Sequence, residues 1–281
     1  AYCFSTNTHK NINKKRTRIM SDYSSQFLTV EVTDHTAVVT FNNPPAHTWT
    51  QQSLTDLRDL VLALNEDKNI YALVLTGSGD KFFSAGADLN VFAQGCKTVA
   101  KDMSDIFGES FETLSNFRGV SISAINGYSM GGGLEVALAC DIRIVEDHAV
   151  MALPEATVGL LPCAGGTQNL SILVGEGWTK RMILCGERVD AATALRIGLA
   201  EEVVAKGEGK TAAIALAAKV AKQSPVAVSA CKTLIQKNRE MPISQALPQE
   251  RQAFIDLFDS EDQKEGVQAF LDKRKPVWKN K

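Results

Sequence analysis

The spacing of apolar and polar positions predicts a layered fold in the first part of the chain. Two β-branched runs, Phe27–Val32 and Thr36–Phe41, are separated by three polar residues and predict a hairpin. Leucine and valine then recur at helical spacing over Leu54–Leu64, and the continuous apolar run Tyr71–Thr76 predicts a buried strand. The order strand, strand, helix, strand indicates an α/β fold in which helices cover a sheet.

The same order of elements recurs further along the chain. A helix over roughly Lys97–Phe117 precedes a predicted strand at Ser121–Asn126, and a run of three glycines then opens a helix at Leu134–Cys140. Two more strands are predicted at Asp141–Val145 and Ala149–Leu153. No strand candidate follows residue 205, where alanine-rich and amphipathic stretches predict helices at Thr211–Lys222, from Pro225 onward, at Ile243–Leu257 and at Asp262–Lys273.

These patterns divide the chain into three parts. Residues 1–19 hold five basic residues, no acid and little apolar periodicity, so they are interpreted as a disordered extension, either upstream of a start at Met20 or an organellar targeting tail. Residues 20–206 are expected to form the core that binds substrate and carries the chemistry. Residues 207–281 are expected to form a helical region, with Gly207-Glu208-Gly209 at the junction.

Composition and charge exclude several classes of function. Lys and Arg number 30 against 32 Asp and Glu, a net charge of −2, whereas nucleic-acid or membrane-surface binders usually carry a basic excess. Six cysteines in 281 residues are too sparse for a disulfide scaffold and favour a reducing compartment. The longest uncharged run, Ala156–Gly175, contains Pro162 and a glycine pair, so no membrane span is expected. We expect a cytoplasmic protein, or an organellar matrix protein if residues 1–19 are a targeting tail.

Two glutamates stand in glycine-rich segments that could carry chemistry. Glu135 lies in the first turn of the helix that follows the three glycines, a position that is typical of an ordinary helix start. Glu155 follows Pro154 in apolar surroundings, which raise the pKa of a carboxyl group and are typical of functional acids, although a strand-end glutamate can also face solvent. Two such groups across a pocket could hold a water and move a proton, but the spacing does not decide whether they meet.

Several motifs in one order resemble the enoyl-CoA hydratase/isomerase (crotonase) superfamily from about Phe27 to the C-terminus. A single such motif would be a weak signal, whereas the series over about 250 residues is specific. The motifs are Ser84-Ala85-Gly86-Ala87-Asp88-Leu89, Asn126-Gly127-Tyr128 through Gly131-Gly132-Gly133-Leu134-Glu135, Ala139-Cys140-Asp141, Pro154-Glu155 and Pro162 to Gln168, followed by Gly186-Glu187-Arg188, Ala191 to Leu199 and Lys273-Arg274-Lys275.

The resemblance implies a fold, an assembly and a class of substrate. The fold would be a spiral of ββα units with a C-terminal helical trimerisation region, giving a homotrimer or a homohexamer built as a dimer of trimers. The substrate would be an acyl-CoA thioester, with no metal and no resident cofactor, because coenzyme A arrives with the substrate and the thioester itself acidifies the α-position. Neither a nucleic acid nor a membrane is an expected partner.

The resemblance also implies roles for individual residues. The backbone N–H groups of Ala87 and Gly132 would form an oxyanion hole for the thioester oxygen. Glu135 would act as base on a water that attacks the β-carbon, and Glu155 would deliver the α-proton. Residues that would contact the substrate are Ala85, Gly86, Asp88, Leu89, Tyr128, Cys163 and, as a lysine for the CoA phosphates or merely one charge in a solvated run, Lys273.

Other activities of the same superfamily remain open at this point. A double-bond isomerase needs only one carboxylate, so the presence of both glutamates favours hydration, while decarboxylases and hydrolases of the fold usually change one or both positions. A non-catalytic or RNA-binding member would be expected to lack the glutamates or to show a basic face.

The chain departs from the family pattern at two places. Pro45-Ala46-His47-Thr48-Trp49 stands where many members have Asn-Ala-Leu, which puts the adenine contacts of this segment in doubt, and His47 is interpreted as a surface or CoA-lining residue. Cys163 replaces a common glycine, but its backbone N–H could still help to place the water.

Overall fold

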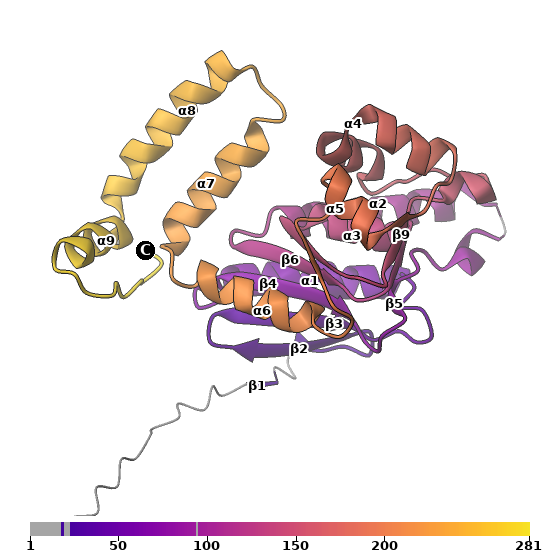
Figure 1. The fold of residues 1–281 in the computed structure, drawn as a ribbon, viewed down its shortest axis with the longest axis horizontal. Helices are drawn as coiled ribbons and strands as arrows, with labels where there is room; N and C mark the ends of the chain where they lie inside the picture. The colour runs from indigo at the N-terminus through magenta and orange to yellow at the C-terminus, as the bar shows by residue number, and fades with distance from the viewer. Residues whose placement is uncertain (1–17, 20–22, 94) are drawn as a thin grey trace, which may run out of the picture.

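The computed structural model describes residues 18–19, 23–93 and 95–281 as a two-sheet α/β core with a helical arm (Figure 1). The larger sheet has the strand order β1-β2-β3-β4-β6-β8-β11, and the smaller has the order β10-β9-β7-β5. In the larger sheet β1, β2 and β3 pair antiparallel, and the pairs from β3 to β11 are parallel. The strands are β1 (Arg18–Ile19), β2 (Leu28–Thr33), β3 (Thr36–Phe41), β4 (Ala72–Gly77), β5 (Phe82–Ser84), β6 (Val120–Ile125), β7 (Tyr128–Met130), β8 (Ile142–Glu146), β9 (Val150–Ala152), β10 (Val189–Asp190) and β11 (Glu202–Val204).

Helices cover both faces of the larger sheet. One apolar core joins the sheet to α1, α2 and α3, while α6 packs on the other face, where Ala213 and Ala217 lie against Val74 and Ile122. Alanines at this contact let the helix approach the strands closely. The helices are α1 (Gln51–Glu66), η2 (Leu89–Phe92), α2 (Lys97–Ser115), α3 (Gly132–Ala139), η3 (Glu155–Val158), α4 (Gly166–Leu184), α5 (Ala191–Ile197), α6 (Gly209–Val220), α7 (Pro225–Lys237), α8 (Ile243–Asp256), η4 (Leu257–Asp259) and α9 (Glu261–Leu271).

Helices α7, α8 and α9 form an arm that extends to one side of the core (Figure 1). Lys232 of α7 anchors the base of the arm, because its ammonium donates to the carbonyls of Phe117 and Gly119 and to the carboxylate of Asp141 at 2.6–3.0 Å. Within the arm, the buried carboxylate of Asp262 accepts hydrogen bonds from Ser224 Oγ at the start of α7 and from the backbone of the C-terminal segment. That segment is joined to the core by the side chain of Asn280, which donates to the carbonyl of Lys68 at 2.8 Å.

The predicted elements are found with boundaries shifted by a few residues, and the fold class is confirmed. Two domain boundaries differ from expectation. The helices do begin at the predicted junction, but α6 belongs to the core, so the arm starts at α7. Arg18 and Ile19, assigned to the N-terminal extension, pair with Val32 and Glu31 of β2; residues 1–17 of that prediction lie outside the described part of the chain. Within the described residues no helix is long and apolar enough to cross a membrane.

Candidate active site

Glu135 and Glu155 both line one cavity of about 680 Å³ at the edge of the smaller sheet. Glu135 comes from the first turn of α3 and Glu155 from the start of η3. The glycine between them brings the two elements together, since a methyl group on Gly131 would lie 3.1 Å from Glu155 Oε1. The structure thus answers the question that spacing left open, and the two carboxyl groups share one cavity.

Glu135 is held rigidly and is buried. Its Oε1 accepts hydrogen bonds from the backbone N–H groups of Ala164 (2.8 Å) and Gly166 (2.9 Å), at the beginning of α4. Burial raises the pKa of Glu135, while these two hydrogen bonds act in the opposite direction because they stabilise the carboxylate. Glu135 therefore keeps a fixed oxygen toward α4 and a free oxygen for the cavity.

Glu155 has a different environment. Both of its oxygens are buried, and neither has a hydrogen-bond partner among the described residues. Burial raises the pKa of Glu155 to about 7, and the nearby Glu135 adds to this shift because two carboxylates repel. Near neutral pH Glu155 is consequently able to hold a proton and to give it up, which an ordinary glutamate does not do.

Ala87 and Gly132, the residues with the two predicted oxyanion N–H groups, line the same cavity. In the described part of the chain no acceptor is hydrogen-bonded to either of them. The two loops that carry them touch, because a methyl group on Gly86 would lie 2.6 Å from the carbonyl oxygen of Met130 and 3.0 Å from the nitrogen of Gly132. Gly86 also has φ +88°, which favours glycine. Two unpaired donors in close loops form a site for a developing negative charge on oxygen.

Cys163 lies on the wall of this cavity, beside the two carboxyl groups. Desolvation raises the pKa of its thiol to about 11, with further contributions from Glu135 and Glu155. At neutral pH the group is a neutral thiol, so the structure offers no support for Cys163 as a nucleophile.

The remaining cavity wall is mainly apolar. Of this group the sequence analysis named only Leu89. The other large apolar residues come from η2, from α2, from the end of η3 and from the segment that follows η3. They are Phe92, Phe107, Val158, Leu160 and Leu161. Two polar residues of α2, Lys101 and Ser104, also line the wall. Such a surface suits an aliphatic chain that ends near the carboxyl groups.

The other predicted substrate residues are placed as follows. Ala85 and Leu89 line the cavity, whereas Gly86 and Asp88 shape the loop behind it, with Asp88 capping η2 by accepting from the N–H of Asn90 (3.1 Å). Tyr128 is not among the residues that line the cavity; its ring is tilted against Phe82 at a centroid distance of 5.6 Å and is 38% exposed, so its contact with an acyl chain stays a prediction.

Two further residues singled out from the sequence lie outside the cavity wall. Lys273 follows α9 in the arm and does not line the cavity of its own chain. His47, interpreted as a surface or CoA-lining residue, is buried: its Nδ1 accepts from the N–H of Asn43 and its Nε2 donates to the carbonyl of Ser78. His47 therefore holds the loop that precedes α1.

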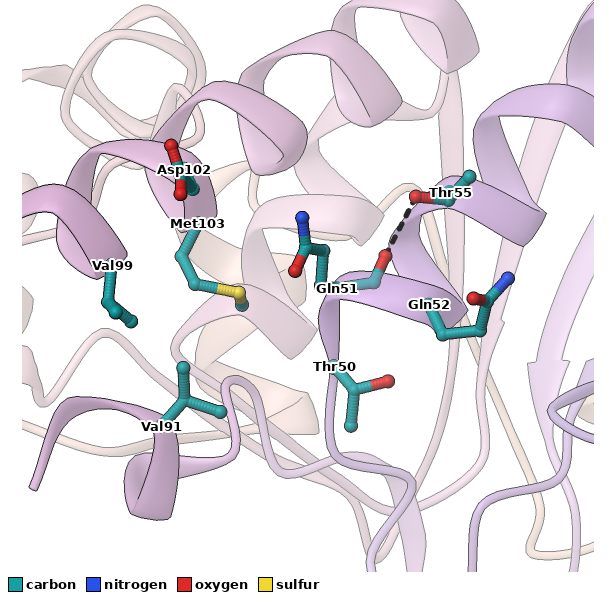
Figure 2. A pocket seen from close by; sticks show the side chains of 8 residues that line it. All are labelled: Thr50, Gln51, Gln52, Thr55, Val91, Val99, Asp102 and Met103. Atoms are coloured by element: carbon teal, nitrogen blue, oxygen red, sulfur yellow. Dashed lines mark hydrogen bonds between the residues drawn. The ribbon is translucent and has the colours of Figure 1, made fainter.

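A second cavity, of about 510 Å³, lies on the other side of α2 at the start of α1 (Figure 2). Figure 2 shows Gln51, Gln52 and Thr55 from α1, with the N-cap residue Thr50, opposite Val99, Asp102 and Met103 from α2; the Thr55 hydroxyl donates to the carbonyl of Gln51. Neither glutamate reaches it, and Asp102 is the one titratable group among its lining residues. This second cavity therefore lacks the pair of carboxyl groups that marks the first.

Comparisons with known proteins agree with this geometry. The family model for enoyl-CoA hydratase/isomerase matches residues 31–281. The short-chain-enoyl-CoA hydratase of Clostridium acetobutylicum is 38% identical over 248 residues, which cover 85% of this chain and 92% of that protein. Among solved structures, DspI of Pseudomonas aeruginosa is 64% identical with a TM-score of 0.90, covering 92% of this chain and 100% of that one. An enoyl-CoA hydratase from Bacillus anthracis is 34% identical with a TM-score of 0.88 and covers 91% and 100%. The chain belongs to the enoyl-CoA hydratase/isomerase family.

Proposed function

We propose that this protein is an enoyl-CoA hydratase, which adds water reversibly across the 2,3-double bond of an α,β-unsaturated acyl-CoA to give the 3-hydroxyacyl-CoA. The observation that carries this assignment is the pair of buried carboxyl groups with different environments, placed on one cavity with two unpaired backbone donors. A hydratase needs both a base and an acid, whereas moving a double bond needs one carboxyl group.

In the proposed mechanism, the thioester oxygen accepts hydrogen bonds from the N–H groups of Ala87 and Gly132. Glu135, tethered through Oε1, uses its free oxygen to take a proton from a water that attacks the β-carbon. The negative charge that develops on the thioester oxygen is stabilised by the two donors, and comparable donors contribute roughly 2.7–4 kcal/mol each. Glu155 then transfers its proton to the α-carbon, and the proton held by Glu135 restores Glu155 through solvent.

The environments of the two glutamates support this division of roles. Hydrogen bonds from Ala164 and Gly166 favour the ionised form of Glu135, which is the form that a base requires. The absence of described partners at Glu155 favours the protonated form, which is the form that an acid requires. The reaction as proposed requires no metal and no resident cofactor, since the thioester acidifies the α-position.

The experiment that tests the function is the loss of the conjugated-thioester absorbance when the purified protein is added to crotonyl-CoA, with formation of 3-hydroxybutyryl-CoA followed by chromatography. The wild type should consume the substrate, while Glu135→Ala and Glu155→Ala should each lose about 10²–10⁴-fold in rate. Binding of crotonyl-CoA without hydration, together with no hydration of longer enoyl-CoAs, would refute the assignment.

We also propose that the arm joins copies of this chain into a trimer, or a hexamer of two trimers. The groove between α7 and α8 is lined by apolar side chains, and Ile235, Ile243 and Phe254 are each more than 60% exposed in the single chain. Burying such a surface against a second copy is favourable. In an assembly, Lys273 of one chain would be free to reach the coenzyme A bound to another, a role that the single chain does not test.

A further inference from the structure

The segment that departs from the family pattern runs directly beside the oxyanion loop. Residues 46–49 lie along residues 84–88, joined by hydrogen bonds from Ala85 N–H to the carbonyl of Ala46 (2.9 Å) and from Ser84 Oγ to the carbonyl of His47 (2.8 Å). The seam ends in a one-residue parallel bridge between Trp49 and Ala87. The segment that precedes α1 therefore holds the backbone of the loop that supplies one oxyanion donor.

The bridge fixes the direction in which Ala87 donates. Trp49 N–H donates to the carbonyl of Gly86 (2.8 Å), and Trp49 carbonyl accepts from Asp88 N–H (2.9 Å), so both bonds go to the neighbours of Ala87. Successive peptide groups of an extended segment point to opposite sides. The N–H of Ala87 consequently points away from Trp49, and Ala87 is on the cavity wall.

The side chain of Trp49 touches the other half of the hole. A methyl group on Gly132 would lie 3.4 Å from Trp49 Cδ1 and 2.9 Å from Phe107 Cε1, so the two rings back the turn that opens α3. The indole is 2% exposed and is packed edge-on against Phe41 (4.9 Å between centroids) and Phe111 (5.8 Å). Its Nε1–H has no acceptor among the described residues. The ring thus serves packing at this position, and hydrogen bonding does not explain its presence.

We infer that Trp49 is a positioning residue for the oxyanion hole: its backbone aims the N–H of Ala87, and its ring, by backing Gly132, sets the separation of the two donors. This inference rests on the proposed function for its kinetic consequences, although the geometry of the hole can be tested without turnover. Donors that stabilise a transition-state oxygen must be placed to within a few tenths of an ångström. A buried, closely packed ring such as that of Trp49 can hold them so; this ring is called the wedge below.

The test compares three substitutions of the wedge with a control elsewhere in the core. Trp49→Ala and the bulkier Trp49→Val both lack the δ-carbon that faces Gly132, while Trp49→Phe retains an aromatic carbon at that place and removes the unpaired N–H. Leu64→Ala opens space at the far end of α1, where Leu64 is fully buried, and serves as a control for general loosening. Each variant is measured for melting temperature, kcat and KM with crotonyl-CoA, and the C=O stretching frequency of bound butyryl-CoA carrying ¹³C at the thioester carbon.

Loss of the wedge should lower kcat about 10- to 100-fold, below the 10²–10³-fold loss of a whole donor, with a much smaller change in KM. The C=O frequency of bound butyryl-CoA should move back toward its value in water, because weaker hydrogen bonds polarise the carbonyl less. Trp49→Phe should stay close to the wild type in both readouts, and Leu64→Ala should lower the melting temperature without changing either.

The inference is overturned if folded Trp49→Ala or Trp49→Val retains the wild-type kcat and C=O frequency, or if Leu64→Ala loses both to the same extent. If Trp49→Ala does not fold, Trp49→Val decides the question with the same readouts. A wild type that binds butyryl-CoA with a lowered C=O frequency but hydrates no enoyl-CoA would refute the proposed function, and the infrared comparison of the variants would still decide the role of Trp49.

Discussion

Replacing Glu155 with glutamine should make the protein more stable and nearly inactive, with a pH dependence that can be worked out from its environment. Burial raises the pKa of Glu155 from an ordinary 4.5 to about 7. Glu155 has a higher pKa in the folded protein than in the unfolded chain. Its contribution to stability is therefore fully present below the unfolded pKa of 4.5 and is lost as the pH rises through the folded pKa of about 7. At pH 8 the folded protein holds an ionised, buried carboxylate that the unfolded chain solvates freely.

The magnitude follows from linkage. With pKa values of 4.5 unfolded and about 7 folded, ionisation of Glu155 costs roughly 3 kcal/mol at pH 8 and less than about 1 kcal/mol at pH 5. Glu155→Gln is neutral at every pH, so it removes this cost. We expect its free energy of unfolding to exceed that of the wild type by roughly 3 kcal/mol at pH 8, with most of the gain absent at pH 5, while kcat falls about 10²–10⁴-fold.

The assay is urea unfolding at pH 5 and pH 8, at one fixed protein concentration because the protein is proposed to assemble. The control is Glu112→Gln, which neutralises an exposed carboxylate on α2 and should change neither stability by more than about 0.5 kcal/mol nor activity. Equal stability of Glu155→Gln and wild type at pH 8 would refute the reasoning, because it would mean that the ionised carboxylate is solvated or paired in the folded protein.

Four further outcomes are expected. Hydration kcat/KM should fall as the pH rises through about 7, approaching tenfold per pH unit, because the acid must be protonated in the free enzyme, and a flat profile across this range would exclude Glu155 as that acid. Glu135→Ala should lower the free energy of unfolding by about 2 kcal/mol or more, because it leaves two buried N–H groups without an acceptor, whereas Glu135→Gln, which can still accept there, should lose activity but keep a near-wild-type urea midpoint. Gly86→Ala should lower kcat by up to 10²–10³-fold, because its methyl group would meet the carbonyl oxygen of Met130 at 2.6 Å and part the oxyanion loops; an unchanged kcat would contradict that contact. Phe254→Glu should shift light-scattering mass from a multiple of the chain to a monomer, and a monomeric wild type would refute the proposed assembly.

The strands and helices that carry strong periodicity could be predicted from the sequence, and so could the glycine segments of the site. Short strands could not: Glu202–Val204 forms β11 only because β8 offers an edge for parallel pairing. Helix α4 (Gly166–Leu184) contains Gly175, which takes φ +74° within the helix, so the helical pattern is interrupted there. Pairing partners and kinks of this kind depend on tertiary contacts, which a local pattern does not contain.

The candidate site shows the same limit. The identity of both glutamates followed from the resemblance, and the pattern around Glu155 indicated its raised pKa. The tether of Glu135 to Ala164 and Gly166 could not be predicted, because backbone donors carry no residue signature. The apolar residues after η3 could not be predicted to line the cavity, because the segment has neither helical nor strand periodicity.

The segment from Pro45 to Trp49 is the clearest case in which a departure from a family pattern gains its meaning from the structure. On sequence alone the change put contacts with the ligand in doubt. In the fold, both ring nitrogens of His47 form hydrogen bonds with nearby backbone groups. Trp49 contacts the two backbone segments proposed to carry the oxyanion donors: it pairs with Ala87, and its ring lies against Gly132. The ring of Trp49 packs edge-on against the aromatic rings of Phe41 and Phe111. The volume at this position is therefore set by packing behind the hole, so exchanges at 49 should act on catalysis through the donors and leave the affinity for coenzyme A largely unchanged.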